Sequence, residues 1–94
     1  MIIVVKSGPD TTDGRRGIAV ARSEGAALIL IQNAVAFAQT ELSGSAGPGA
    51  TYVLENDLRL RGFNPEDLDE RIQRIGYPEF VDLVTAADKV VGTF

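Results

Sequence analysis

The sequence predicts an α/β fold of three layers, in which a mainly parallel sheet of four to five strands is flanked by helices. Apolar runs that suit strands alternate with segments that suit helices, and this alternation is typical of parallel sheets with helical crossovers. Three of the runs are apolar at consecutive positions, as expected of strands that are covered on both faces. The chain has 94 residues, so we expect one domain over residues 1–94.

The first 31 residues predict two strands and a helix between them. Ile2–Val5 is a β-branched run that stops at a Ser-Gly-Pro turn, and Ala27–Ile31 is a second apolar run. Between the runs we expect a short helix near residues 13–23, whose first half is weakened by two glycines. Thr11 is one of the residues that can cap its start, and Gly25 can end it in a left-handed conformation.

The middle of the chain predicts a second helix, a loop and a third strand. Asn33–Leu42 has apolar residues at spacings of three and four, which is the pattern of an amphipathic helix. The stretch 43–49 is rich in glycine and serine and indicates a surface loop. Thr51–Leu54 is the third apolar strand.

The last part of the chain predicts short helices and the edges of the sheet. Glu55–Arg61 indicates one or two helical turns, and Asn64, followed by proline and two acids, marks another helix start. Arg71–Ile75 alternates between polar and apolar residues, which favours a half-exposed edge strand. Pro78–Ala87 predicts an amphipathic helix, and the apolar stretch Val90–Phe94 is a candidate for a last strand.

The chain contains neither cysteine nor histidine. Without a thiolate it has no sulfur nucleophile, persulfide carrier or soft metal ligand of its own. Without an imidazole it lacks the group that titrates near neutral pH, activates serine or ligates zinc. We therefore expect no metal or other cofactor, and a protein that positions something rather than an independent enzyme.

Charge and hydropathy disfavour two classes of partner. The net charge is −4; residues 1–48 carry four basic and four acidic side chains, and residues 49–94 carry five basic and nine acidic ones. The absence of a basic stripe disfavours direct binding to nucleic acid or to an anionic membrane. The longest apolar stretch, Ala26–Ile31, is too short to span a bilayer, and the N-terminal segment does not fit a signal peptide. We expect a cytoplasmic location.

Polar residues that follow the three apolar strands form a candidate site. Ligands of open α/β sheets bind outside the carboxyl ends of the strands, so these residues are predicted to share one rim. Structural capping or contact between subunits is the favoured interpretation. A general acid–base pair of two acids at positions i and i+2 is less favoured, because such side chains diverge on a helix. The rim residues are Lys6 and Ser7, Gln32 and Asn33, and Glu55 and Asp57.

The turn after the first strand is a second candidate site. Ser7, Gly8, Gly14 and Arg15 lie around a strand-to-helix connection of the kind where doubly wound folds bind phosphate through backbone amides. The spacing matches neither the Walker pattern nor the dinucleotide fingerprint. A glycine-tolerant turn with solvated arginines is the favoured interpretation, and an anion-binding or small-molecule-binding module is the alternative.

Four acids lie close together in the second half of the chain. They do not have the spacing of a calcium loop, and two of them are explained by the positive end of the expected helix. We interpret the cluster as solvated surface. It consists of Glu66, Asp67, Asp69 and Glu70.

Three stretches, taken in order, resemble one known family. Met1–Pro9 is an apolar strand that runs into a Lys-Ser-Gly-Pro turn, and Gly25–Val35 contains the apolar second strand followed by Gln-Asn-Ala-Val. Tyr52–Leu58, followed by Arg61-Gly62, begins the third stretch, which continues through Ile75–Leu83 to a terminal aromatic residue. This chain resembles the DsrH/TusB family over nearly its whole length, with Asn-Ala where the second block of the family has Asp-Gly.

The resemblance implies a small subunit with the DsrE-like fold. Members of this superfamily act in sulfur relay, either in 2-thiolation of the tRNA wobble uridine, a step of tRNA processing, or in dissimilatory sulfur oxidation. They usually assemble with two related subunits, one of which carries the persulfide-forming cysteine. The implied partners are DsrE/DsrF-like (TusD/TusC-like) subunits, or further copies of this chain. A chain without cysteine fits the non-catalytic, TusB-like role, with Gln32, Asn33, Glu55 and Asp57 at an interface or site rim.

Overall fold

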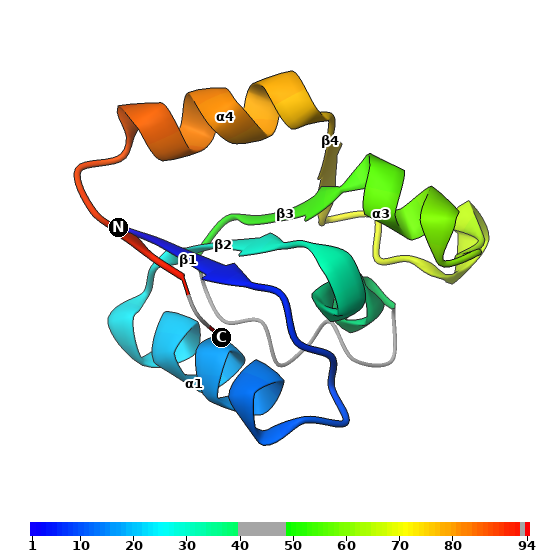
Figure 1. The fold of residues 1–94 in the computed structure, drawn as a ribbon, viewed down its shortest axis with the longest axis horizontal. Helices are drawn as coiled ribbons and strands as arrows, with labels where there is room; N and C mark the ends of the chain where they lie inside the picture. The colour runs from blue at the N-terminus through cyan, green and yellow to red at the C-terminus, as the bar shows by residue number, and fades with distance from the viewer. Residues whose placement is uncertain (40–48, 93) are drawn as a thin grey trace.

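The computed structural model describes residues 1–39, 49–92 and 94, which form one parallel sheet with helices on both faces (Figure 1). Neighbouring strands follow the order β4-β3-β2-β1-β5, and every neighbouring pair runs parallel. This arrangement confirms the predicted fold class. The strands are β1 (Ile2–Val5), β2 (Ala27–Leu30), β3 (Thr51–Leu54), β4 (Gln73–Ile75) and β5 (Val90–Val91).

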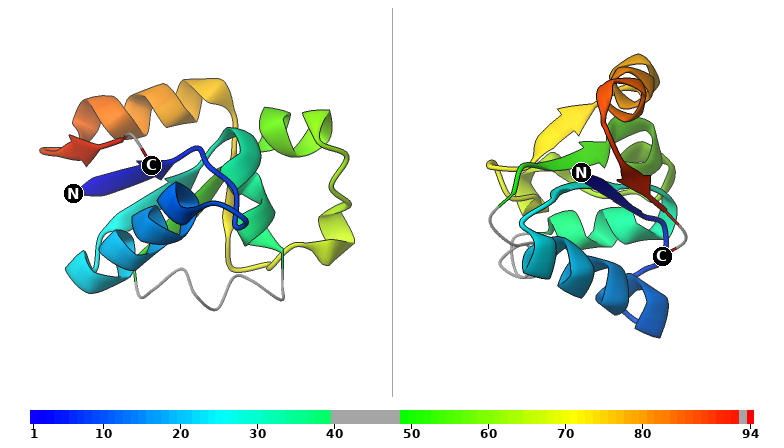
Figure 2. Two further views of the ribbon diagram at one scale, coloured as in Figure 1. Left: turned by 60° about the horizontal axis from the view of Figure 1, so that its bottom comes forward. Right: turned by 90° about the vertical axis from the view of Figure 1, so that its left-hand side faces the viewer.

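Helical segments connect the strands and make the outer layers. Helix α1 lies against one face of the sheet and α4 lies over the opposite face (Figure 2). The short helix α3 follows β3 without a break, at the carboxyl edge of the sheet. The segments are the α-helices α1 (Thr12–Glu24), α3 (Glu55–Leu60) and α4 (Tyr77–Ala86), and the 3-10 helices η1 (Gln32–Ala38) and η2 (Pro65–Asp67).

The predicted ends of α1 are confirmed. The side chain of Thr11 accepts a hydrogen bond from the backbone amide of Gly14, which satisfies a donor in the first turn. Gly25 has a φ of 61°, the left-handed conformation that glycine adopts without a steric penalty. Gly17 lies on the inner side of the helix, where an added Cβ would meet Val5 and Phe94 at 2.7 Å. Glycine at this position therefore lets the helix approach the sheet closely.

The helix predicted over Asn33–Leu42 is present, but it is a 3-10 helix rather than an α-helix. The segment forms the 3-10 helix η1, while its last three residues lie outside the described part of the chain. Gln39 is extended and pairs with Leu68 in an antiparallel bridge, and the carbonyl of Ala38 accepts the amide of Asp69 at 2.9 Å. Hydrogen bonds to the segment after η2 thus take the place of another helical turn. The expected loop 43–49 also lies outside the described residues, except for Gly49.

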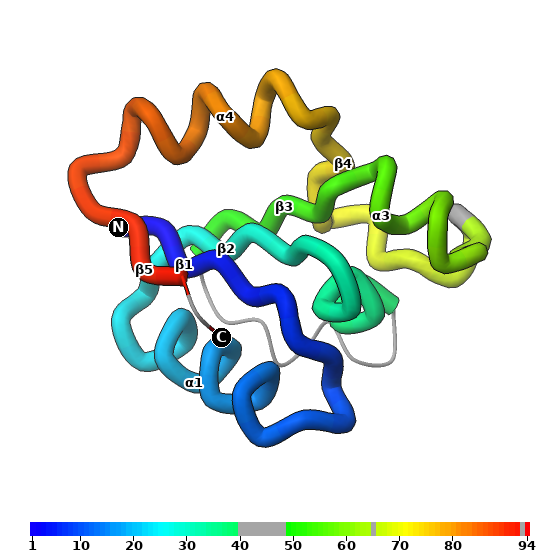
Figure 3. Tube along the Cα trace, in the orientation of Figure 1, coloured from blue at the N-terminus to red at the C-terminus, as the bar shows by residue number. Residues whose placement is uncertain are grey.

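The other boundaries agree with the sequence to within a few residues. The alternating segment contributes β4 at one edge of the sheet, as predicted, although the strand begins only at Gln73. The apolar end of the chain contributes β5 at the other edge, where Ile2 and Ile3 pair with Val90 and Val91 (Figure 3). Both edges are short, which limits the open backbone available to another strand.

The two faces of the sheet are buried to different degrees. Ile3, Leu28 and Val53 belong to the main core, which includes residues of α1, η1 and α3. Ile29 and Leu54 are also buried, and alternation along the strands turns them to the face covered by α4. No residue of α4 itself is buried. The core is therefore concentrated between the sheet and α1. Within the described residues, no helix is long and apolar enough to cross a membrane.

Candidate functional site

A cavity of about 520 Å³ opens where β1 and β2 end. Parallel strands end at the same edge of a sheet, so the connections that leave them surround a shared hollow. We call it the carboxyl-edge pocket. Its walls are Lys6, Ser7 and the turn 8–11 after β1, Gln32, Asn33 and Ala36 after β2, and Arg61 and Phe63 after α3.

Gln32 is held in an unusual conformation at this pocket. Its φ of 50° lies in the left-handed region of backbone conformations, which residues other than glycine, asparagine and aspartate seldom adopt. Its backbone amide donates a hydrogen bond of 2.7 Å to Oδ2 of Asp57. The side chain of Asp57 is only 15% exposed, so solvent weakens this contact less than it would at an open surface.

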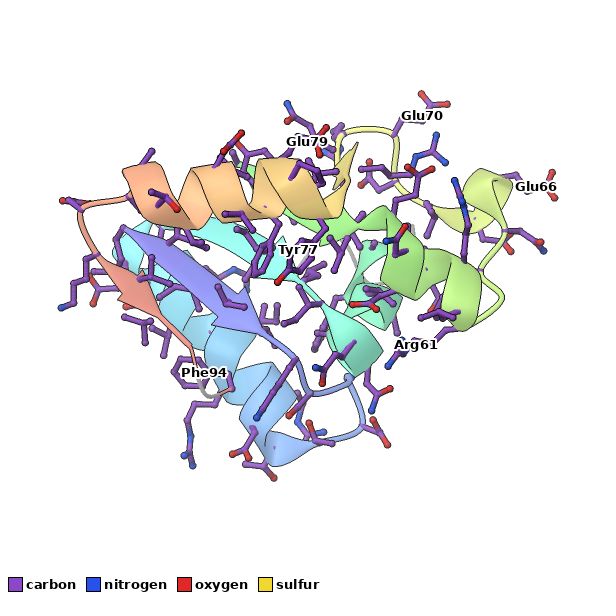
Figure 4. All side chains as sticks on the ribbon, turned by 45° about the horizontal axis from the view of Figure 1, so that its top comes forward. Arg61, Glu66, Glu70, Tyr77, Glu79 and Phe94 are labelled. Atoms are coloured by element: carbon purple, nitrogen blue, oxygen red, sulfur yellow. The ribbon has the colours of Figure 1, made fainter. Side chains whose placement is uncertain are left out.

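Arg61 completes a chain of contacts between α3 and η1. It follows Asp57 by one helical turn, and its Nη1 lies 3.7 Å from Oδ1 of that carboxylate. Its Nε donates a hydrogen bond of 3.0 Å to Oδ1 of Asn33. Arg61 lies near the junction of the two helices (Figure 4). The structure thus connects Gln32 and Asn33, which follow β2, to Asp57 on α3 and to Arg61, which caps the end of that helix.

Glu55 does not join this network. Its Oε1 lies 3.7 Å from Nη2 of Arg59, one turn along α3; Arg59 is exposed and Glu55 is half-buried. Asp57 and Glu55 therefore contact different residues, as expected for positions i and i+2 on a helix. Of the four residues expected at an interface or site rim from the family resemblance, Gln32, Asn33 and Asp57 meet in one network, and Glu55 stays outside it.

The turn after β1 uses many of its amides internally. Lys6 and Ser7 both donate their backbone N–H to the carbonyl oxygen of Phe94 at 3.1 Å. The carbonyl of Gly8 accepts both the amide and the hydroxyl of Thr11. Gly14 donates to the same threonine side chain. Of the residues predicted for an anion site here, Ser7 and Gly8 line the carboxyl-edge pocket, while Gly14 packs beneath the turn.

Arg15 points its guanidinium back along the chain. Its Nη1 donates a hydrogen bond of 3.0 Å to the carbonyl oxygen of Pro9. It lines a separate groove between α1 and η1 rather than the carboxyl-edge pocket. The four residues of the predicted anion turn are thus divided between two surfaces.

The acidic cluster includes an ion pair between Asp69 and Arg71, and the other three acids are exposed. Both carboxylate oxygens of Asp69 accept hydrogen bonds from the guanidinium of Arg71, the shorter at 2.7 Å. This hydrogen bonding, followed by the carboxylate charge, raises the pKa of Arg71. Glu66, Asp67 and Glu70 are exposed. No group of three acids within the described residues has the arrangement of a metal site.

Arg61 and Phe63 line the pocket although neither is among the predicted site residues. A signal for Arg61 was present, because Asp57 and Arg61 have the i, i+4 spacing that pairs charges on a helix. No comparable signal marked Phe63, which reaches the pocket because the turn after α3 brings its amide to the carbonyl of Leu58 at 3.1 Å.

The fold and this site define a small α/β protein with a polar pocket at the carboxyl edge of a parallel sheet and no thiol of its own. Residues 16–90 of the chain match the model of a protein family described as DsrH like protein. The chain therefore belongs to the DsrH/TusB family, a sulfur-relay-related family whose members normally work with other subunits.

Two solved structures are similar to the chain over almost its whole length. The protein Tm0979 from Thermotoga maritima, solved by NMR, is 33% identical, with 95% of this chain and 97% of that chain covered and a TM-score of 0.68. The ychN protein from E. coli, solved by crystallography, is 18% identical, with 98% and 97% covered and a TM-score of 0.73. The second similarity concerns the fold alone. No curated protein was found to match the chain.

Proposed function

We propose that this chain is a non-catalytic subunit of a sulfur-relay complex, of the kind that serves tRNA wobble uridine 2-thiolation or dissimilatory sulfur oxidation. One observation carries the proposal: a member of the DsrH/TusB family has no cysteine at any of its 94 positions. A persulfide forms on a cysteine thiolate, so the sulfur must be carried by another subunit. The role left to this chain is to bind that subunit and shape its reaction site.

The proposed partners are related DsrE/DsrF-like (TusD/TusC-like) subunits in the cytoplasm. We place the contact at the carboxyl-edge pocket and its rim, where Gln32, Asn33 and Asp57 are fixed by hydrogen bonds and Glu55 is partly exposed. Lys6 and Arg61 bring positive charge to the pocket walls, Asp10 brings one negative charge, and Arg61 is paired with Asp57. A cation beside a thiolate or persulfide stabilises the anion and lowers the pKa of the sulfur. The chain would thus promote sulfur transfer on a neighbour without carrying sulfur.

Co-expression with the DsrE-like and DsrF-like proteins of the same genome tests the assembly. We expect co-purification of a defined complex, measured by size-exclusion chromatography with light scattering. After exposure to a persulfide donor, mass spectrometry should find the added sulfur on a partner cysteine and never on this chain. Stable labelling of the isolated chain would contradict the proposal, and so would failure to capture any related subunit.

Substitution of the two cations tests the role of the pocket within that complex. Lys6→Met and Arg61→Met should raise the pKa of the partner's reactive cysteine, measured as the pH dependence of its alkylation rate. Arg59→Met is the matched control, because Arg59 pairs with Glu55 and does not line the pocket. Equal effects of all three variants would place the contact elsewhere.

A second candidate function is a small-molecule or anion-binding module that acts without partner subunits. The observation that favours it is the pocket of about 520 Å³ with Lys6 and Arg61 in its walls. A ligand that binds only the folded state raises the melting temperature with concentration. Phosphate, sulfate, thiosulfate and nucleotides are the probes, and the shift should be lost in Lys6→Met. No shift with any of them would remove this candidate.

A further inference from the structure

The carboxyl-edge pocket contains one balanced ion pair and two unpaired charges. The guanidinium of Arg61 lies beside the carboxylate of Asp57, so these two charges offset each other. Within the part of the chain that the structure describes, the side chains of Lys6 and Asp10 form no ion pair or hydrogen bond. Both residues are exposed and both line the pocket. The pocket therefore offers a ligand one ammonium and one carboxylate.

The carboxylate of Asp10 lies over a glycine. A Cβ added at Gly8 would be 2.8 Å from Oδ1 of Asp10 and 3.5 Å from the backbone carbonyl oxygen of Asn33. The two oxygens are therefore no more than about two hydrogen-bond lengths apart. An amino group beside Gly8 can donate to both, since an ammonium carries three donors. Glycine has no side chain to fill this space, which suits it to a cationic amino group.

The remaining walls supply a positive charge and an apolar surface. Lys6 follows β1 and brings the unpaired ammonium, whereas Arg61 uses its Nε on Asn33 and its charge on Asp57. Phe63 and Ala36 are half-buried and form part of the pocket wall. A ligand in this pocket thus meets a cation, an anion and an apolar surface.

We propose that the carboxyl-edge pocket binds a free amino acid in its zwitterionic form. The ammonium of the ligand donates to Asp10 and to the carbonyl of Asn33, and its carboxylate pairs with Lys6. An apolar or aromatic side chain packs against Phe63. This inference rests on the second candidate function, because it names the class of ligand for the same pocket.

The unpaired carboxylate disfavours ligands with several negative charges. A phosphate or a nucleotide gains from Lys6 but is repelled by Asp10, since like charges at close range oppose binding. A zwitterion satisfies both unpaired charges and leaves the occupied pocket electrically balanced. The cavity of about 520 Å³ lies within the usual range of small-molecule sites, about 300–1,000 Å³.

Three ligands of similar shape and different charge test the inference. L-phenylalanine carries both charges, 3-phenylpropionate lacks the amino group, and phenethylamine lacks the carboxylate. NMR titrations of the isotope-labelled chain near neutral pH measure the three dissociation constants. Phenylalanine should bind about two- to fivefold more tightly than either analogue, which is the gain expected from one exposed ion pair. Its addition should shift the amide signals of Gly8 and Asn33.

Variants of the two unpaired charges should remove separate parts of this preference. Asp10→Asn should abolish the advantage of phenylalanine over 3-phenylpropionate, and Lys6→Met should abolish its advantage over phenethylamine. Gly8→Ala should weaken the binding of phenylalanine, because the added methyl displaces the Asp10 carboxylate. The φ of Gly8 is not positive, so alanine fits the backbone there. Circular dichroism checks that each variant is folded.

Two matched variants control for a general effect of charge. Asp13→Asn and Lys89→Met change exposed residues that do not line the pocket. Both variants should bind the three ligands with the same order of affinities as the unchanged chain.

Equal affinities for the three ligands would overturn the inference, and so would an Asp10→Asn variant that still prefers phenylalanine to 3-phenylpropionate. If phosphate or sulfate binds and phenylalanine does not, the inference fails while the second candidate function stands. If none of these ligands binds, both fail. The titrations use the purified chain without partner subunits or sulfur donors, so their outcome is separate from that of the sulfur-relay tests.

Discussion

Asp57 on α3 holds the backbone of Gln32 in a left-handed conformation across the end of β2. The amide of Gln32 donates to Oδ2 of Asp57 at 2.7 Å, while the φ of Gln32 is 50°. A left-handed residue other than glycine costs about 1–2 kcal/mol, and a hydrogen bond to a charged acceptor contributes about 1.5–3 kcal/mol. The hydrogen bond therefore offsets the strain and fixes one wall of the carboxyl-edge pocket.

Asp57→Ala should lower the free energy of unfolding by about 1–3 kcal/mol, because the Gln32 amide loses its acceptor and the Arg61 guanidinium loses its ion-pair partner. Urea denaturation followed by circular dichroism measures the loss. Glu55→Ala is the matched control on the same helix, and its exposed pair with Arg59 should contribute less than about 1 kcal/mol. Similar losses for both variants would mean that Asp57 has no special role in stability.

Substitutions of Gln32 test the strain directly. Gln32→Gly should change the free energy of unfolding by less than about 1 kcal/mol, because relief of the left-handed strain is balanced by the greater freedom of glycine in the unfolded chain. Gln32→Val should destabilise by about 1–3 kcal/mol, since a β-branched residue tolerates a positive φ poorly. The two melting curves should therefore separate clearly. A valine variant as stable as the glycine variant would contradict the strain.

The sheet was predictable because its central strands are short continuous apolar runs. Ile2–Val5 and Thr51–Leu54 have the predicted bounds, and the second run differs by one residue. Because consecutive residues of a strand point to opposite faces of the sheet, a continuous apolar run indicates a strand that is covered on both faces. This holds without knowledge of the elements that cover it. The edge strand β4 was predictable for the opposite reason, since its polar and apolar residues alternate.

The details of the site depend on contacts between segments that are distant in sequence. Gln32 and Asp57 are 25 positions apart, and the sequence around each of them gives no sign that the backbone of Gln32 is left-handed. The helical periodicity after Asn33 identified the buried stripe, but it did not indicate that the end of η1 pairs with Leu68 and Asp69. The local pattern of apolar residues thus predicted which residues are buried, whereas the backbone conformation at the site depends on hydrogen bonds between distant segments.

The ion pair between Asp88 and the amino group of Met1 predicts a weak dependence of stability on pH. The N-terminal ammonium lies 3.3 Å from Oδ1 of Asp88, and its hydrogen bond, followed by its charge, lowers the pKa of this carboxyl below the usual 3.8. A lowered pKa means that the contribution is present above the unfolded-state pKa and is lost as the pH falls through the folded-state value.

An NMR titration of the Asp88 carboxyl measures this shift. The midpoint should lie below 3.8 in the folded chain and should move up toward that value when salt is added, because the pair is exposed. Acetylation of the amino group removes its charge and should have the same effect. A midpoint at or above the ordinary value at low salt would show that the pair does not form in solution.

Gly17→Ala should destabilise the protein although alanine is the better helix former. Its Cβ would lie 2.7 Å from Cγ2 of Val5 and from Cβ of Phe94, so α1 or the chain end must move. Overpacking of this kind costs about 1–3 kcal/mol, against a gain of about 1 kcal/mol from helix propensity.

Ala19→Gly, on the exposed side of the same helix, measures the propensity alone. In a Phe94→Ala background the loss from Gly17→Ala should shrink by at least about 0.5 kcal/mol. Additive losses in urea denaturation would show that Phe94 does not contact the helix at this glycine.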